Sequence, residues 1–146
     1  MRFILPVCLA LMSCGGKPTT VEDFNITEVT LPGGQVIKAE TRISQEDMLR
    51  GMMFRTSIAP DHGLLYFYRN PGHYQLWMYQ TPLRLDMIWM DDNHKIVEIV
   101  ENAAPCESAA SKCPQIGGHE MARYVLQIGG GMAQRYRLSL GQAIRW

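Results

Sequence analysis

Asp86 is the carboxylate in this sequence whose position best suits chemistry. It opens the apolar stretch Asp86–Met90 and follows the turn segment Gln80–Leu85. A buried carboxylate must be paired or hydrogen-bonded, and burial raises its pKa toward the range of a general base. A small envelope hydrolase or transferase could therefore use Asp86 together with Arg55 or His62.

A structural role for Asp86 remains open beside this one. Its carboxylate can accept backbone N–H groups of the Gln80–Leu85 turn, or it can pair with Arg55, whose planar guanidinium suits a carboxylate. Arg55 is itself either a binding-site cation or a clamp that organises the loop after a helix.

Aromatic and amide side chains near Asp86 suggest a ligand site. The candidate ligand-binding residues are Arg55, Trp77, Tyr79, Gln80 and Asp86. A cleft for a sugar or an aromatic ring could be lined by the aromatic side chains of Trp77, Tyr79, Tyr66, Tyr68 and Trp89. The alternative is ordinary packing in the core and on the sheet faces.

Other kinds of chemistry lack their motifs. The histidines, His62, His73, His94 and His119, have no metal-ligand spacing, and no GxSxG elbow is present. Gly129-Gly130-Gly131 is not followed by the Lys-Ser/Thr of a phosphate loop. We therefore expect no metal, no cofactor and no recognised catalytic motif.

Charge and composition narrow the class of partner. The chain has 14 basic and 14 acidic residues and a formal net charge of zero, which argues against nucleic acid, where a basic stripe is expected. Ten methionines are a high number. Most are expected in the core, and the alternative is an adaptable binding surface.

The first residues are expected to form a targeting signal rather than part of the fold. Arg2 precedes a short apolar run that is too short to span a bilayer, so residues 1–13 are typical of a signal peptide. The end of this run, Leu11-Met12-Ser13-Cys14, resembles the lipobox of bacterial lipoproteins. That resemblance implies acylation of Cys14 and a membrane anchor. Gly15 after Cys14 resembles the pattern of lipoproteins passed to the outer membrane, which implies its periplasmic face in a Gram-negative bacterium. Residues 14–24 would form the lipidated cysteine and a flexible tether.

Two cysteines remain in the exported domain. Cys106 and Cys113 are expected to form a disulfide in an oxidising compartment. A metal or redox pair is the alternative, although redox pairs more often have CxxC spacing and a metal needs further ligands.

Two apolar segments are expected to form the centre of the fold. Tyr74–Tyr79 and Asp86–Met90 are apolar at nearly every position, whereas a strand with one face in water should alternate. Both are therefore predicted to be paired strands that are covered on both faces.

The remaining segments predict a mainly β domain over residues 25–146. Further strands are expected at 25–31, 35–43, 64–68, 95–101, 123–128 and 141–146, and short helices after Ser44 and at 132–138. Met48, Leu49, Met52 and Met53 form the apolar stripe of the first helix, with Gly51 inside it. Without a βαβ rhythm, we expect an antiparallel β-sandwich or barrel of about seven or eight strands.

Several segments also match, in the same order, the motifs of one protein family. They are Arg50–Arg55, Asp61–Phe67, Trp77–Met87, Asn102–Cys106, Cys113-Pro114 and Ala122–Leu126. In these the chain resembles domain of unknown function 192, over roughly Ile37 to the C-terminus. The resemblance implies a compact, mainly β fold that is often exported, and no established activity. The family usually has Lys and Asn where this chain has Tyr79 and Gln80.

These features favour a lipid-anchored binding or accessory module of the cell envelope. Its partner would be an envelope small molecule, a glycan or a protein. The lipid anchor would attach the module to the membrane.

Overall fold

The computed structural model describes residues 25–146. The predicted signal peptide at 1–13, the predicted acylated Cys14 and the predicted tether at 14–24 all lie outside these described residues, so those predictions stay predictions. Within residues 25–146, no helix has the length and apolar character needed to cross a membrane.

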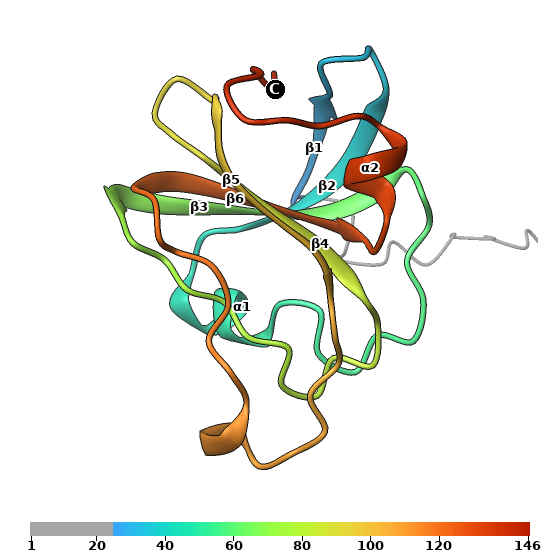
Figure 1. The fold of residues 1–146 in the computed structure, drawn as a ribbon, viewed down its shortest axis with the longest axis vertical. Coiled ribbons are helices and arrows are strands. Elements are labelled where there is room, and N and C mark those ends of the chain that lie inside the picture. The colour runs from blue at the N-terminus through green and yellow to red at the C-terminus, as the bar shows by residue number, and fades with distance from the viewer. Residues whose placement is uncertain (1–24) are drawn as a thin grey trace, which may run out of the picture.

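The described residues fold around one six-stranded mixed sheet with the order β1-β2-β3-β6-β4-β5 (Figure 1). The strands and helices, in chain order, are β1 (Ile26–Thr30), β2 (Val36–Arg42), α1 (Gln45–Arg50), β3 (His62–Gly72), β4 (Leu85–Met90), β5 (Ile96–Ala103), the 3₁₀ turn η2 (Ala110–Lys112), β6 (Ala122–Gly129) and α2 (Met132–Arg135). The mainly β class with two short helices is confirmed. The strands number six rather than seven or eight, and they form one open sheet rather than a sandwich or barrel.

Strand β4 is buried at every position, as the sequence predicted. Met87 and Trp89 belong to a core on one face of the sheet, and Ile88 and Met90 belong to a core on the other. Helix α2 and the C-terminal segment cover the Ile88 face through Ala133, Leu138 and Ile144. We refer to this as the α2 face and to the opposite side as the α1 face.

The segment Tyr74–Tyr79 is not a strand of the sheet, so this part of the prediction was wrong. The neighbours of β4 are β5 and β6. Residues 74–79 instead cover the α1 face, where Leu76 and Met78 enter the core. Their backbone makes only isolated bridges, Leu76 with Ile116 and Tyr79 with Cys106. The segment is apolar because it covers a core, which periodicity alone does not distinguish from a buried strand.

The end of the chain also forms bridges instead of a strand. Thr30 pairs with Arg145 and Lys95 with Ala143, so the last residues connect the β1 edge of the sheet to the turn between β4 and β5. These contacts link the two edges while the sheet itself stays open.

One pair of strands was not foreseen. Strands β2 and β3 run parallel, with Lys38 opposite His62 and Arg42 opposite Tyr66. Helix α1, the short helix predicted after Ser44, lies in the crossover between them, and Ser44 is its N-cap and accepts the Asp47 N–H. A six-residue helix followed by a long irregular segment hides the βαβ pattern that usually indicates parallel strands.

Candidate functional site

The Asp86 side chain is fully buried on the α2 face and accepts three backbone hydrogen bonds. Its Oδ1 accepts the N–H of Asn102 at 2.8 Å and of Gly131 at 3.0 Å, and its Oδ2 accepts the N–H of Ala133 at 2.7 Å. The predicted backbone role is thus present with different donors, because the Gln80–Leu85 turn supplies none of these three. Asp86 ties the start of α2 and the end of β5 to β4.

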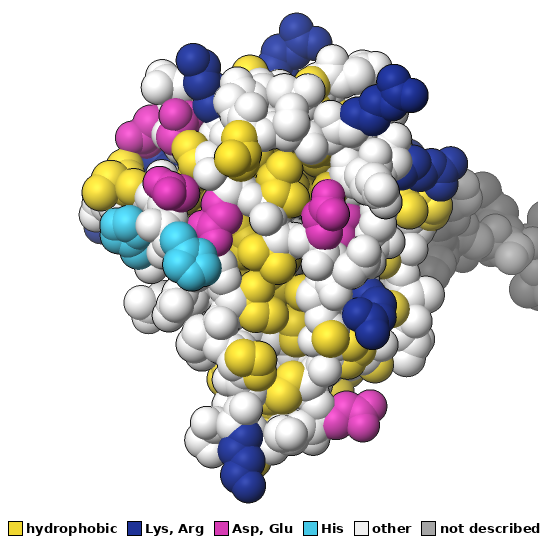
Figure 2. All heavy atoms as spheres, viewed as in Figure 1, with side chains coloured by type: hydrophobic (Ala, Val, Ile, Leu, Met, Phe, Trp, Pro, Cys, Tyr) yellow, Lys and Arg dark blue, Asp and Glu magenta, His cyan; other side chains and the backbone are white. Residues whose placement is uncertain are grey.

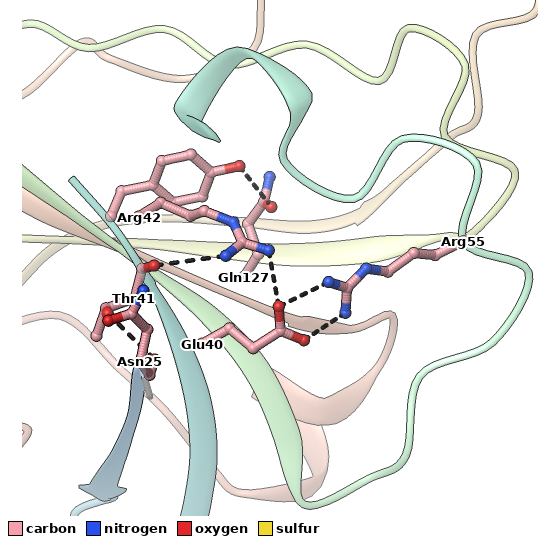
Figure 3. A network of polar contacts seen from close by, with 7 residues as sticks. Asn25, Glu40, Thr41, Arg42, Arg55 and Gln127 are labelled. Atoms are coloured by element: carbon pink, nitrogen blue, oxygen red, sulfur yellow. Dashed lines mark hydrogen bonds and ion pairs between the residues drawn. The ribbon is translucent and has the colours of Figure 1, made fainter. Parts of the chain in front are cut away.

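Arg55 pairs with Glu40 rather than with Asp86 (Figure 3). Its two Nη atoms bind the two carboxylate oxygens of Glu40 at 2.6 and 2.7 Å, and Arg42 binds the same carboxylate at 2.7 Å. The hydrogen bond from Arg55 holds the pKa of Glu40 below its ordinary value, against the effect of burial. Arg55 therefore clamps the loop after α1 onto β2, which is the structural interpretation of this residue.

His62 lies at the exposed start of β3, where its Nδ1 is 2.8 Å from Asp61 Oδ1. That hydrogen bond lowers the pKa of Asp61. Neither residue lines the cavity described next.

A cavity of about 540 Å³ lies on the α1 face, between α1 with the residues that follow it and the segment Tyr74–Trp77. Met48, Met52 and Met53 form one wall, and the rings of Tyr68, Tyr74 and Trp77 form another. Leu49, at 61% exposure, lines its opening to solvent. All four residues of the predicted stripe line the cavity, but only Met48 and Leu49 lie in α1. The helix ends at Arg50, so the prediction was wrong in placing Met52 and Met53 on it.

The floor of the cavity is polar. Tyr66 of β3 and Gln127 of β6 are 2% and 3% exposed, and the Tyr66 hydroxyl donates to Gln127 Oε1 at 3.0 Å (Figure 3). Burial raises the pKa of Tyr66 far above its ordinary value, so the phenol stays neutral and remains a donor.

Gly51 allows this floor to form. It ends α1 with φ 44° and ψ −123°, and a Cβ built there would lie 2.5 Å from the Tyr66 hydroxyl. The glycine therefore lies at the end of the helix rather than inside it, in close contact with a side chain. A side chain at this position would displace Tyr66.

A stack of rings fixes the aromatic wall. Tyr68 and Tyr74 lie face to face with centroids 3.5 Å apart, and burial raises the pKa of Tyr68 to about 12. Trp89 Nε1 donates to the carbonyl of Tyr74 at 2.7 Å, which attaches the stack to β4.

A disulfide-bonded loop holds the covering segment in place. Cys106 and Cys113 are bonded, as predicted. Cys106 N–H donates to the carbonyl of Met78, and Ile116, just after the loop, exchanges two backbone hydrogen bonds with Leu76 at 2.9 and 2.8 Å. The wall between Tyr74 and Met78 therefore depends on residues that are 28 to 40 positions away in the sequence.

Of the candidate ligand residues, the structure brings only Trp77 to the cavity. Arg55, Tyr79, Gln80 and Asp86 do not line it. Sequence reasoning missed Gln127, a polar residue inside the apolar strand Ala122–Gly129. A lone amide in a buried strand was the available signal. Within residues 25–146, no three histidine, cysteine or carboxylate residues are grouped so that they could hold a metal ion.

The comparisons with known proteins agree with this fold. The sequence profile of DUF192, described as "Uncharacterized ACR", matches residues 27–146. The chain belongs to the DUF192 family. A search of curated proteins found no match.

Two solved structures resemble this DUF192 protein. A protein of unknown function from Novosphingobium aromaticivorans is 26% identical, with a TM-score of 0.73, over 83% of this chain and 85% of that one. A Sinorhizobium meliloti protein named a "putative transcription regulator" is 28% identical, with a TM-score of 0.69, over 81% of this chain and 89% of that one.

Proposed function

We propose that this DUF192 protein is an exported, lipid-anchored binding module of the cell envelope that holds a small molecule in the α1-face cavity. The cavity is the observation that carries the binding role. Its volume of about 540 Å³ lies within the range of small-molecule sites, and such sites combine mostly apolar walls with a few fixed polar groups. The methionine and tyrosine walls above the Tyr66–Gln127 pair have this composition.

The enzyme alternative finds less support in the geometry. It requires Asp86 to act with Arg55 or His62, yet Asp86 is enclosed on the α2 face and accepts three backbone N–H groups. Arg55 holds Glu40, and His62 lies beside Asp61 at the surface. No observation therefore favours catalysis by these residues over binding in the cavity.

Nucleic acid is also disfavoured as a partner, despite the name of the Sinorhizobium meliloti protein. Basic and acidic residues balance at 14 each. On the face shown in Figure 2, Lys and Arg side chains are scattered around the margin, and an apolar band runs through the middle. A nucleic-acid site usually gathers its basic residues in a patch or stripe.

The anchor part of the proposal rests on the lipobox-like Leu11–Cys14 and on Gly15, which favours the periplasmic face of the outer membrane. Labelling with an alkyne fatty acid should mark the wild-type protein and leave Cys14→Ala unmarked, and the labelled protein should fractionate with outer membranes. Equal labelling of both proteins, or a soluble periplasmic wild type, would contradict the anchor.

The cavity part is tested with the full-length protein in nanodiscs and the neutral dye 6-propionyl-2-dimethylaminonaphthalene. We expect one bound dye per chain with blue-shifted emission, after subtraction of the signal from empty nanodiscs. Leu49→Trp, at the opening, should weaken binding several-fold. Leu140→Trp is the matched control, because Leu140 is similarly exposed at 65% and lies outside the cavity. Equal binding by the two variants would refute the cavity as the site.

A further inference from the structure

One amide nitrogen on the floor of the cavity has no hydrogen-bond partner among residues 25–146. Gln127 is 3% exposed, and its Oε1 accepts the Tyr66 hydroxyl. Its Nε2 makes no hydrogen bond to any residue among 25–146. Among the fully enclosed polar side-chain atoms of residues 25–146, only Arg123 Nε lacks a hydrogen-bond partner. The unpartnered Gln127 Nε2 is therefore not fully enclosed. Because Gln127 lines the cavity, this nitrogen is reached from there.

The direction of this amide agrees with that conclusion. Figure 3 shows the nitrogen of Gln127 on the side of the amide away from the Glu40, Arg42 and Arg55 cluster. Buried amide donors in native proteins are nearly always hydrogen-bonded. The floor therefore presents a donor to whatever occupies the cavity.

The charges around the cavity disfavour a cationic ligand. No Asp or Glu among the described residues lines it, whereas Arg50 does. Arg42 and Arg55 lie close enough to Tyr66 that their positive charges act on its hydroxyl. A cation at the floor would lose its hydration and gain no counter-charge.

An anionic ligand is disfavoured for a different reason. Arg42 and Arg55 already share the Glu40 carboxylate, which satisfies much of their charge. The other arginine of the lining, Arg50, is exposed at the end of α1, so a carboxylate on the buried floor would be desolvated among methionine and tyrosine side chains.

The side walls of the cavity indicate the polarity of the rest of the ligand. Met48, Met52 and Met53 supply flexible, polarizable side chains opposite the Tyr68–Tyr74 stack. Methionine adapts to irregular apolar shapes and makes favourable contacts with rings. An apolar body fits between these two walls.

We infer that the ligand is an uncharged, apolar molecule carrying a hydrogen-bond acceptor, such as a carbonyl oxygen, which accepts from Gln127 Nε2. This inference rests on the proposed function, because it names the ligand class for the same cavity. Gln127 is then the residue that selects the acceptor.

Three probes with one ring system test this inference. They are 2-acetylnaphthalene, which has a neutral acceptor, 2-ethylnaphthalene, which has none, and 2-naphthoate, which is an anion. Each is titrated calorimetrically into full-length protein in nanodiscs, and the heat of partitioning into empty nanodiscs is subtracted. We expect 2-acetylnaphthalene to bind up to about tenfold more tightly than the other two, the usual range for one added hydrogen bond.

The double variant Tyr66→Phe/Gln127→Met removes the donor together with its partner, so that no buried polar group is left alone. It should bind 2-ethylnaphthalene as the wild type does and lose the preference for 2-acetylnaphthalene. A melting curve checks that the variant is folded. If it is not, Gln127→Glu takes its place and should bind 2-acetylnaphthalene less tightly.

The outcomes separate the two proposals. Equal affinity of the wild type for the acetyl and ethyl probes, or tightest binding of 2-naphthoate, would overturn the inference and leave the binding function standing. A preference for the acetyl probe that survives in the variant would also overturn it. Failure of all three probes to bind would contradict the proposed function and this inference with it.

Discussion

Replacement of Asp86 by Asn should destabilise the protein strongly and leave ligand binding intact. In Asp86→Asn, one oxygen can still accept from Asn102 and Gly131, but the new NH₂ group faces the N–H of Ala133. One hydrogen bond to a charged acceptor is lost and one buried N–H is left unsatisfied, which together cost about 2–4 kcal/mol.

The assay is thermal and urea unfolding of the full chain, followed by circular dichroism. For a chain of this size we expect the Tm to fall by about 8–16 °C. Asp92→Asn is the matched control. Asp92 is half-exposed and ion-paired with Arg123 at 3.0 Å, so its loss should cost less than about 1 kcal/mol.

Binding of the naphthalene dye should be the same in folded Asp86→Asn and in the parent, because Asp86 lies on the α2 face and the cavity on the α1 face. A variant that melts with the parent would refute the structural role of Asp86. A variant that melts with the parent and also loses the ligand would place Asp86 in the site instead.

Three further predictions follow from the contacts around the cavity. Gly51→Ala should destabilise the protein more than Gly34→Ala does. Both glycines have positive φ, so the strained backbone costs about 1–2 kcal/mol in each variant, but only at Gly51 would the new Cβ meet a neighbour, the Tyr66 hydroxyl. Equal unfolding curves for the two variants would show that this close contact is unimportant. Cys106→Ser/Cys113→Ser should lower the free energy of unfolding by about 2.5 kcal/mol for this short loop. It should also weaken dye binding, because Cys106 holds Met78 and Ile116, just after the loop, holds Leu76; an unchanged dye affinity would contradict that link. Arg55 lowers the pKa of Glu40 in the folded state, so the pair stabilises the fold above the ordinary pKa of 4.5 and this stabilisation is lost as the pH falls below it. Glu40→Gln should therefore flatten the decline of stability below pH 4.5. Parallel stability curves for the two proteins would argue against the Arg55–Glu40 clamp.

The local pattern of the sequence predicts those elements whose partners lie nearby in the chain. The turn between β1 and β2, the Ser44 cap of α1 and the complete burial of β4 all follow from residue types within a few positions. The pairing of Cys106 with Cys113 was predicted on the expectation that the chain is exported and that these two cysteines alone remain after the signal peptide and the acylated cysteine.

The contacts that define the site are long-range and were not predictable in this way. Gln127 meets Tyr66 across 61 residues, and Asp86 accepts N–H groups that lie 16 to 47 residues away. Residues 74–79 look like a strand because they bury Leu76 and Met78, yet they cover the sheet instead of joining it. Apolar content reports burial and does not report which partner the backbone finds.

The most direct test of the cavity as the ligand site is native mass spectrometry of the full-length protein extracted from the envelope of cells that produce it. We predict that the wild type and Leu140→Trp carry one additional small-molecule mass, and that a several-fold smaller fraction of Leu49→Trp carries it. An equal fraction in Leu49→Trp, or absence of that mass from all three proteins, would contradict the account.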